Sequence, residues 1–156
     1  MRLWAKQIIP LLPREQLIGQ YRELCAIAAN LANEGTPNHL LVNKILDYSI
    51  EHLYTYAVLV RKEMTLRKIV TRDDVWNNFI NNLKIFCGYD NFIEIDYDRL
   101  YDNWMTKEYL IQCLTNLKEK YDCGGIELID WFKIINGVRG LNILSQEEFD
   151  FAFDSK

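Results

Sequence analysis

Apolar residues recur at steps of three and four along several stretches of the chain, which is the spacing of an amphipathic helix. The first such stretch lies between Pro13 and Gly35, and its apolar positions are Leu17, Tyr21, Leu24, Ala28 and Leu31. Proline is favoured at the first turn of a helix and glycine just past its end. The sequence therefore predicts one long helix between Pro13 and Gly35, with a single buried face.

Two further helices are expected in the next third of the chain. The segment Thr36-Pro37-Asn38 is typical of a turn, and it precedes a helix predicted at about residues 39–48. Ser49 is a favoured N-cap residue and is expected to start the next helix, which continues to about Arg67.

The capping residues of the second half predict the remaining elements. Thr71 with Asp74 resembles a capping box and indicates a helix that ends at Gly88. Residues 89–103 show no helical period, so we expect a long connection there. Thr106 is expected to start a helix that ends near residue 121.

Two short helices should complete the fold, one around residues 126–135 and one capped by Ser145 with Glu148. No stretch alternates as a strand would. The pattern as a whole predicts an all-α fold, a compact single-domain helical bundle over residues 1–156 with a long connection near residues 89–103.

Composition agrees with this expectation and excludes several classes of protein. The 156 residues include only 7 Gly and 3 Pro, which suits helices better than a turn-rich β fold. The apolar run at the start is short and is interrupted by prolines, unlike a secretory signal, and no segment approaches the roughly 20 apolar residues of a membrane span. We therefore expect a cytoplasmic protein without a membrane partner.

The cysteines and histidines give no indication of a metal site. The four cysteines are widely spaced and contain no C-x-x-C pair, and His39 and His52 do not stand at ligand spacing from any of them. Reduced thiols in a reducing compartment are the expected state. We predict no metal and no cofactor.

Charge is divided unevenly along the chain, although its net value is −4. Residues 1–72 carry ten Lys or Arg against six Asp or Glu, whereas residues 73–156 carry eight against sixteen. A phosphate backbone would prefer the first half, and the acidic second half would suit a protein partner. The alternative is that both halves simply present solvated charges.

The segment Leu12–Leu24, LPREQLIGQYREL, contains the most informative polar residues. Arg22 lies off the apolar stripe of its helix, and the small residues Gly19 and Ala26 lie one turn before and after it. Small neighbours allow another backbone to approach an arginine closely, which suits a phosphate contact. Glu23 is adjacent and also lies off the stripe. The alternative interpretation is an ordinary solvated helix face.

Several ungapped blocks occur in a recognisable order along most of the chain. They are MRLW at the start, LPR..QL.GQ.RE in the first helix, PNHLLVNKILDY after it, and NW.TKEYL..CL.NL.EKY further on. Together they resemble the pyrimidine-dimer DNA glycosylase (endonuclease V) family.

The resemblance implies a DNA glycosylase with abasic-site lyase activity, which acts on pyrimidine dimers in UV-damaged duplex DNA without a metal or cofactor. The α-amine of the chain would be the nucleophile. Here it would belong to Met1, because an initiator methionine followed by Arg2 is retained. An α-amine with a pKa of about 7.7–8.0 is roughly a tenth free base near neutral pH, unlike lysine. By the same resemblance, Glu23 would stabilise positive charge and move protons, and Arg22 would position a phosphate or the sugar.

The same resemblance and the local sequence indicate further DNA contacts. These are Arg2, Trp4, Arg14, Asn38 and His39, of which Asn38 and His39 could equally serve as cap and turn residues.

Two positions depart from the family pattern. Ala5 stands where many relatives have histidine, and Ala26 stands where a second arginine is expected. These departures favour the alternative function, a non-catalytic DNA- or protein-binding module on the same fold.

Overall fold

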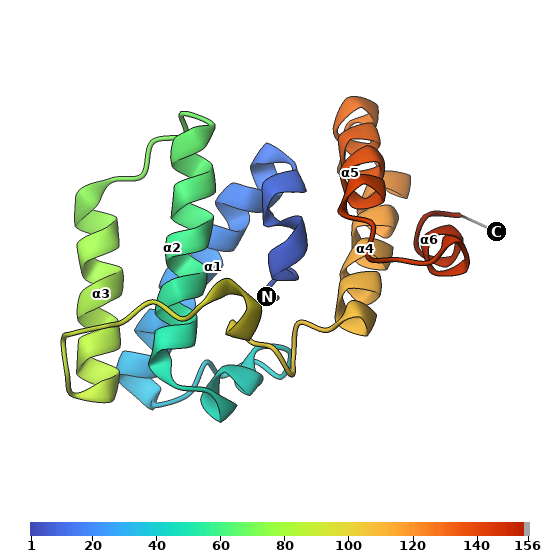
Figure 1. Cartoon of the computed structure of the whole chain (residues 1–156). Coiled ribbons are helices and arrows are strands. Elements are labelled where there is room, and N and C mark those ends of the chain that lie inside the picture. The colour runs from blue at the N-terminus through green and yellow to red at the C-terminus, as the bar shows by residue number, and fades with distance from the viewer. Residues whose placement is uncertain (155–156) are drawn as a thin grey trace. The chain divides into compact units, whose positions relative to one another are not determined.

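The computed structural model describes residues 1–154, and all regular secondary structure in this part of the chain is helical (Figure 1). No β-strand occurs in it, as the sequence predicts. Six α-helices and three short 3-10 helices follow one another in the order η1 (Lys6–Leu11), α1 (Arg14–Glu34), η2 (Asn43–Asp47), α2 (Ile50–Leu66), α3 (Asp73–Cys87), η3 (Tyr97–Arg99), α4 (Lys107–Asp122), α5 (Leu128–Leu141) and α6 (Gln146–Phe153). None of these helices is long and apolar enough to cross a membrane.

The chain divides into two compact units, and each unit is discontinuous in sequence. The first unit contains Met1–Leu3 and Glu15–Asp102, and the second contains Trp4–Arg14 and the chain from Asn103 onward. The first unit therefore holds almost all of α1 together with α2 and α3, and the second holds η1 with α4, α5 and α6.

In the first unit α2 packs beside α3, and α1 passes behind α2 in the view of Figure 1. The predicted apolar stripe of α1 is buried along its whole length, from Leu17 to Leu31. The expected connection after α3 is present and contains only the short turn η3. It is fixed to α2 by backbone groups, because the N–H of Ile95 donates to Thr55 Oγ1 at 2.8 Å and that of Tyr101 donates to His52 Nδ1 at 3.0 Å.

In the second unit α4 packs against α6, and α5 packs against η1. The contact with η1 depends on Gly137, because a Cβ there would collide with Leu11. The predicted caps at Thr106 and Ser145 are present. Thr106 Oγ1 accepts the N–H of Tyr109 at 3.3 Å, and Ser145 and Glu148 form a complete capping box at the start of α6.

The prediction of a helix at about residues 39–48 is wrong in the type of helix and in its length. This stretch forms a turn followed by the 3-10 helix η2 over Asn43–Asp47. Side chains satisfy the local backbone groups instead, because the N–H of His39 donates to Asn43 Oδ1 at 3.2 Å and that of Leu41 donates to His39 Nδ1 at 3.3 Å. Such bonds compete with those of an α-helix.

The caps predicted for α2 and α3 also differ from the structure. Ser49 is the N-cap residue of α2, but its side chain makes no capping hydrogen bond. The N-cap of α3 is Arg72 and not Thr71, whose hydroxyl accepts the Nε–H of Arg61 at 3.2 Å. The helix predicted at about residues 126–135 is longer than expected, because α5 continues to Leu141 before Asn142 ends it in a left-handed conformation.

Candidate functional site at the chain start

The start of the chain contacts α1 through the backbone of Arg2. The N–H of Arg2 donates to Glu23 Oε2 at 3.1 Å, across 21 positions of sequence. A carboxylate that accepts a backbone N–H makes a stronger bond than a neutral acceptor would. This bond therefore holds the first residues beside the exposed side of α1 that the sequence singles out.

The buried side chain of Gln20 makes a second contact with the chain start. Gln20 Nε2 donates to the carbonyl oxygen of Arg2 at 2.9 Å and lies 3.4 Å from Glu23 Oε2. Its carbonyl oxygen accepts the hydroxyl of Tyr56 at 2.8 Å. Gln20 is only 1% exposed and Tyr56 is 0% exposed, so these bonds form away from solvent.

The position of Arg2 limits how far the Met1 amine can be from Glu23. Successive backbone nitrogens are at most about 3.6 Å apart, and the nitrogen of Arg2 lies 3.1 Å from Glu23 Oε2. The Met1 nitrogen is therefore within about 7 Å of that oxygen. A single bridging water spans about 6 Å between the groups that it joins, so a water-mediated contact is possible where the first residue is less than fully extended.

Glu23 and Arg22 both retain groups that a ligand could reach. Glu23 is half-buried, and its second carboxylate oxygen, Oε1, has no hydrogen-bond partner within residues 1–154. Arg22 is exposed on the outer side of α1 and forms no ion pair with any described residue. Met1 is 36% exposed. An α-amine, a carboxylate and a cation thus all have accessible surface at or near the chain start.

The remaining predicted contacts are not gathered at this point. Trp4, which the sequence analysis places among the DNA contacts, is buried and only 7% exposed. Arg14 is exposed at the first position of α1. Asn38 and His39 shape the turn before η2, where Asn38 has a positive φ of 55° and its N–H donates to Thr36 Oγ1 at 3.1 Å.

Sequence reasoning missed Gln20 and Tyr56. Gln20 stands three residues after Leu17 and four before Leu24, which is a core position of the predicted stripe. A polar residue at such a position must find hydrogen-bond partners inside the protein, and this was the available signal. Tyr56 gave no such signal, because a tyrosine in an apolar stripe is ordinary.

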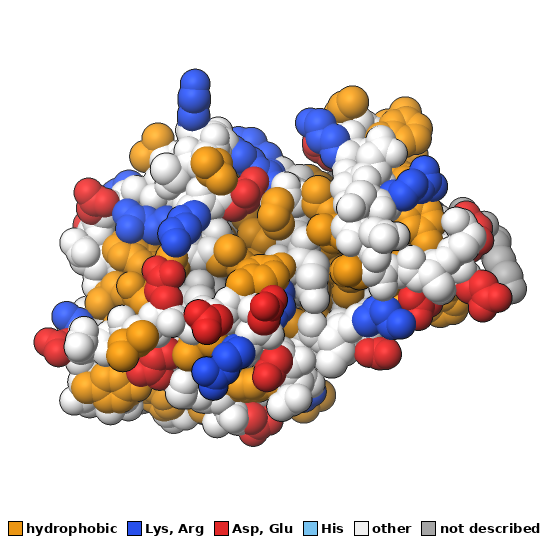
Figure 2. Space-filling model, in the orientation of Figure 1, with side chains coloured by type: hydrophobic (Ala, Val, Ile, Leu, Met, Phe, Trp, Pro, Cys, Tyr) orange, Lys and Arg blue, Asp and Glu red, His pale blue; other side chains and the backbone are white. Residues whose placement is uncertain are grey.

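On the face of the molecule shown in Figure 2, the basic side chains of the first half do not form one positive surface. On the face over α2 and α3, Lys and Arg side chains alternate with Asp and Glu (Figure 2). Arg61 pairs with Asp73 at 3.0 Å, and Arg67 pairs with Glu63 at 2.7 Å. Cations that are already paired offer less to a phosphate than Arg22 does.

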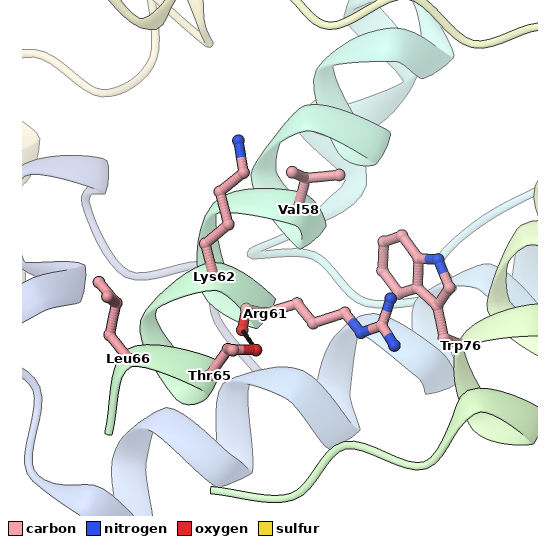
Figure 3. Close-up of a pocket in the computed structure, with 6 residues that line it drawn as sticks. All are labelled: Val58, Arg61, Lys62, Thr65, Leu66 and Trp76. Atoms are coloured by element: carbon pink, nitrogen blue, oxygen red, sulfur yellow. Dashed lines mark hydrogen bonds between the residues drawn. The ribbon is translucent and has the colours of Figure 1, made fainter. Parts of the chain in front are cut away.

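A separate cavity lies between α2 and α3 in the same unit (Figure 3). It has a volume of about 470 Å³, and Val58, Arg61, Lys62, Thr65, Leu66 and Trp76 line it. The Arg61 guanidinium turns toward the Trp76 ring, 4.7 Å from the ring centre. None of the residues predicted for the site lines this cavity.

The cysteines and acidic residues give no further chemistry. Burial raises the pKa of the Cys25 thiol, which makes it a poorer nucleophile. Within residues 1–154 no three His, Cys, Asp or Glu side chains are grouped so that they could hold a metal ion.

These features define a small all-helical protein whose own chain start meets a carboxylate of its longest helix. The sequence profile of the pyrimidine dimer DNA glycosylase family matches residues 1–77, so the chain is similar to that family over these residues. The searches of curated proteins and of solved structures found no match.

Proposed function

We propose that this protein is a DNA glycosylase with abasic-site lyase activity, which removes pyrimidine dimers from UV-damaged duplex DNA through an imine on its own α-amine. The observation that supports this proposal best is the bond between the Arg2 N–H and Glu23, because it brings the chain start to a carboxylate that is still partly open. The family match over residues 1–77 includes both groups.

In the proposed reaction the free-base amine of Met1 attacks C1′ of the sugar that carries the damaged base. The new N–C1′ bond forms as the bond from C1′ to the base nitrogen breaks, and its electron pair leaves with the base. The open oxygen of Glu23 faces the positive charge that develops at the sugar, where a fixed carboxylate stabilises the transition state. No metal or cofactor takes part.

The lyase step follows from the product of the first step. Loss of a proton from nitrogen and opening of the sugar ring give an imine at C1′. The imine makes the C2′ proton acidic, and its removal expels the 3′ phosphate by β-elimination. Glu23 is the nearest carboxylate that could carry this proton.

Arg22 is proposed to bind the DNA backbone beside the reacting sugar. It is exposed, it has no acidic partner among the described residues, and it precedes Glu23 directly. A phosphate contact next to the carboxylate would hold the sugar in place for attack, and orientation of this kind contributes several orders of magnitude in rate. Arg14, Asn38, His39 and the side chain of Arg2 are proposed as weaker contacts with the duplex.

The alternative is a DNA- or protein-binding module that lacks turnover. The specific observation in its favour is that a backbone N–H, and not an amine, occupies Glu23 Oε2. Ala26, exposed on α1 where an arginine would add a phosphate contact, is consistent with this alternative. Ala5 bears less on it, because this position is fully buried.

Chemical trapping distinguishes the two functions. Untagged protein is incubated with dimer-containing or abasic duplex and sodium borohydride, which reduces an imine to a stable amine. We expect a covalent adduct, and peptide mapping should place the DNA on Met1. An adduct on Lys6 or another lysine would refute the assigned nucleophile. Folded, DNA-binding protein that gives no adduct with either duplex would establish the binding module.

A further inference from the structure

The oxygen and the nitrogen of the Gln20 side-chain amide have different hydrogen-bond partners. Its oxygen accepts from Tyr56, and its nitrogen donates to the Arg2 carbonyl and lies near Glu23 Oε2. Rotating the amide by half a turn would direct the oxygen at the Arg2 carbonyl and at the carboxylate, both of which are acceptors. The Arg2 carbonyl and the Glu23 carboxylate therefore select the orientation in which nitrogen faces the chain start, and the Tyr56 hydroxyl holds the oxygen at the other end of the amide.

Burial makes this arrangement costly to change. Gln20 and Tyr56 are 1% and 0% exposed, so solvent cannot replace a lost partner. The two bonds to Arg2 also act in concert, because its N–H is held by Glu23 and its carbonyl by Gln20. Both polar groups of one residue are thus fixed, and the direction in which Met1 extends from Arg2 is restricted.

We infer that Gln20, anchored by Tyr56, is the positioning residue that aligns the α-amine with Glu23. This inference rests on the proposed function, since it assigns a purpose to the alignment. Neither side chain is expected to touch DNA, and the effect is transmitted through the Met1–Arg2 peptide and the carboxylate. The sharpest perturbation is Gln20→Glu, which keeps the shape of the side chain and removes the two N–H donors.

The first measurement is the single-turnover rate of borohydride trapping on abasic duplex. At pH 7.5 Gln20→Glu should lower this rate about 10- to 100-fold, the effect of a misplaced nucleophile. The loss relative to wild type should shrink at lower pH, because the introduced carboxyl then gains a proton and can again donate to the Arg2 carbonyl. A merely structural defect would give the same loss at every pH.

The second variant is milder and keeps the test decisive if Gln20→Glu does not fold. Tyr56→Phe removes only the hydroxyl that anchors the amide oxygen, and the trapping rate should fall roughly three- to tenfold, as expected for loss of one neutral hydrogen bond. Tyr54→Phe is the matched control on the same helix. Its ring packs near Trp76 and Phe92, away from the chain start, and its rate should stay within about twofold of wild type.

Duplex affinity and amide exchange separate positioning from other causes. The dissociation constant for abasic duplex should be unchanged in both variants, because only buried groups are altered. Exchange of the Arg2 amide, followed by NMR without DNA, should become faster in both. Wild-type trapping and exchange rates in both variants would overturn the inference. Absence of trapping in wild type would instead contradict the proposed function, and the exchange measurement would then decide the positioning role separately.

Discussion

The register of the chain start provides the most direct test of the proposed nucleophile. The Arg2 nitrogen lies 3.1 Å from Glu23 Oε2, and each residue added before it moves the terminal amine by at most about 3.6 Å. The amine is thus within about 7 Å of this oxygen in a chain that begins at Met1 and within about 10 Å after one added glycine. A chain that begins at Arg2 would place its amine at the oxygen itself.

These three chains should differ in rate although they share the side chains of Arg22 and Glu23. One bridging water reaches across about 6 Å, which the Met1 amine can satisfy and the amine of the extended chain in general cannot. We expect the extra glycine to slow borohydride trapping about 100-fold. The chain that begins at Arg2 should be trapped at least as fast as wild type, with the adduct on Arg2.

The assay compares trapping rates on the same abasic duplex, with the adduct located by peptide mass. Circular dichroism and duplex affinity serve as controls, and both should be equal in the three chains because Arg22 and the helices are untouched. Trapping of the glycine-extended chain at the wild-type rate would refute the reasoning, since the amine would then act without its alignment to Glu23.

Three further predictions concern charge. Glu23→Gln should keep the fold and the bond from the Arg2 N–H but slow base excision by about 100- to 1000-fold, because an amide carries no charge to stabilise the sugar; release of the damaged base measures this effect. Arg22→Ala should leave the melting temperature unchanged and reduce the slope of log affinity against log salt by about one, and an unchanged slope would exclude a phosphate contact. The hydrogen bond from Lys107 lowers the pKa of Glu148, so the ion pair should stabilise α6 above about pH 5 and be lost as pH falls through that lowered pKa; the melting temperatures of wild type and Glu148→Gln should therefore converge in acid.

Helix positions were predictable where one strong periodic pattern was closed by clear end signals. The pattern between Pro13 and Gly35 gave α1 within one residue at each end, because apolar spacing and both ends agreed. The helix prediction for residues 39–48 was wrong because the side chains of His39 and Asn43 bond to local backbone groups. These bonds compete with helix formation, and apolar spacing does not reveal them. The cap predicted at Thr71 was wrong because the Thr71 hydroxyl accepts a hydrogen bond from Arg61, ten residues away.

For the site, the family resemblance directed attention to Glu23, but the support beneath it came only from the structure. Gln20 stands at a position of the apolar stripe of α1, which indicates that a polar group is buried there but does not identify its partners. The burial of Trp4 was likewise not predictable, since its position three residues after Met1 gave no information about it. Long-range pairs such as Gln20 with Tyr56, 36 residues apart, require the packing of two helices to be known.

The discontinuous composition of the two units determines how the protein tolerates truncation. The chain passes from one unit to the other after Leu3, after Arg14 and again after Asp102. A fragment that ends at Asp102 would keep every residue of the candidate site, yet it would lose α5, on which η1 packs, and with it the setting of the fully buried Ile8 and Ile9. The apolar residues of η1, which connects the chain start to α1 in the sequence, would then lack their packing partner α5. The second half therefore supplies the packing partner of a segment from the first fifteen residues, and removing it would expose that segment.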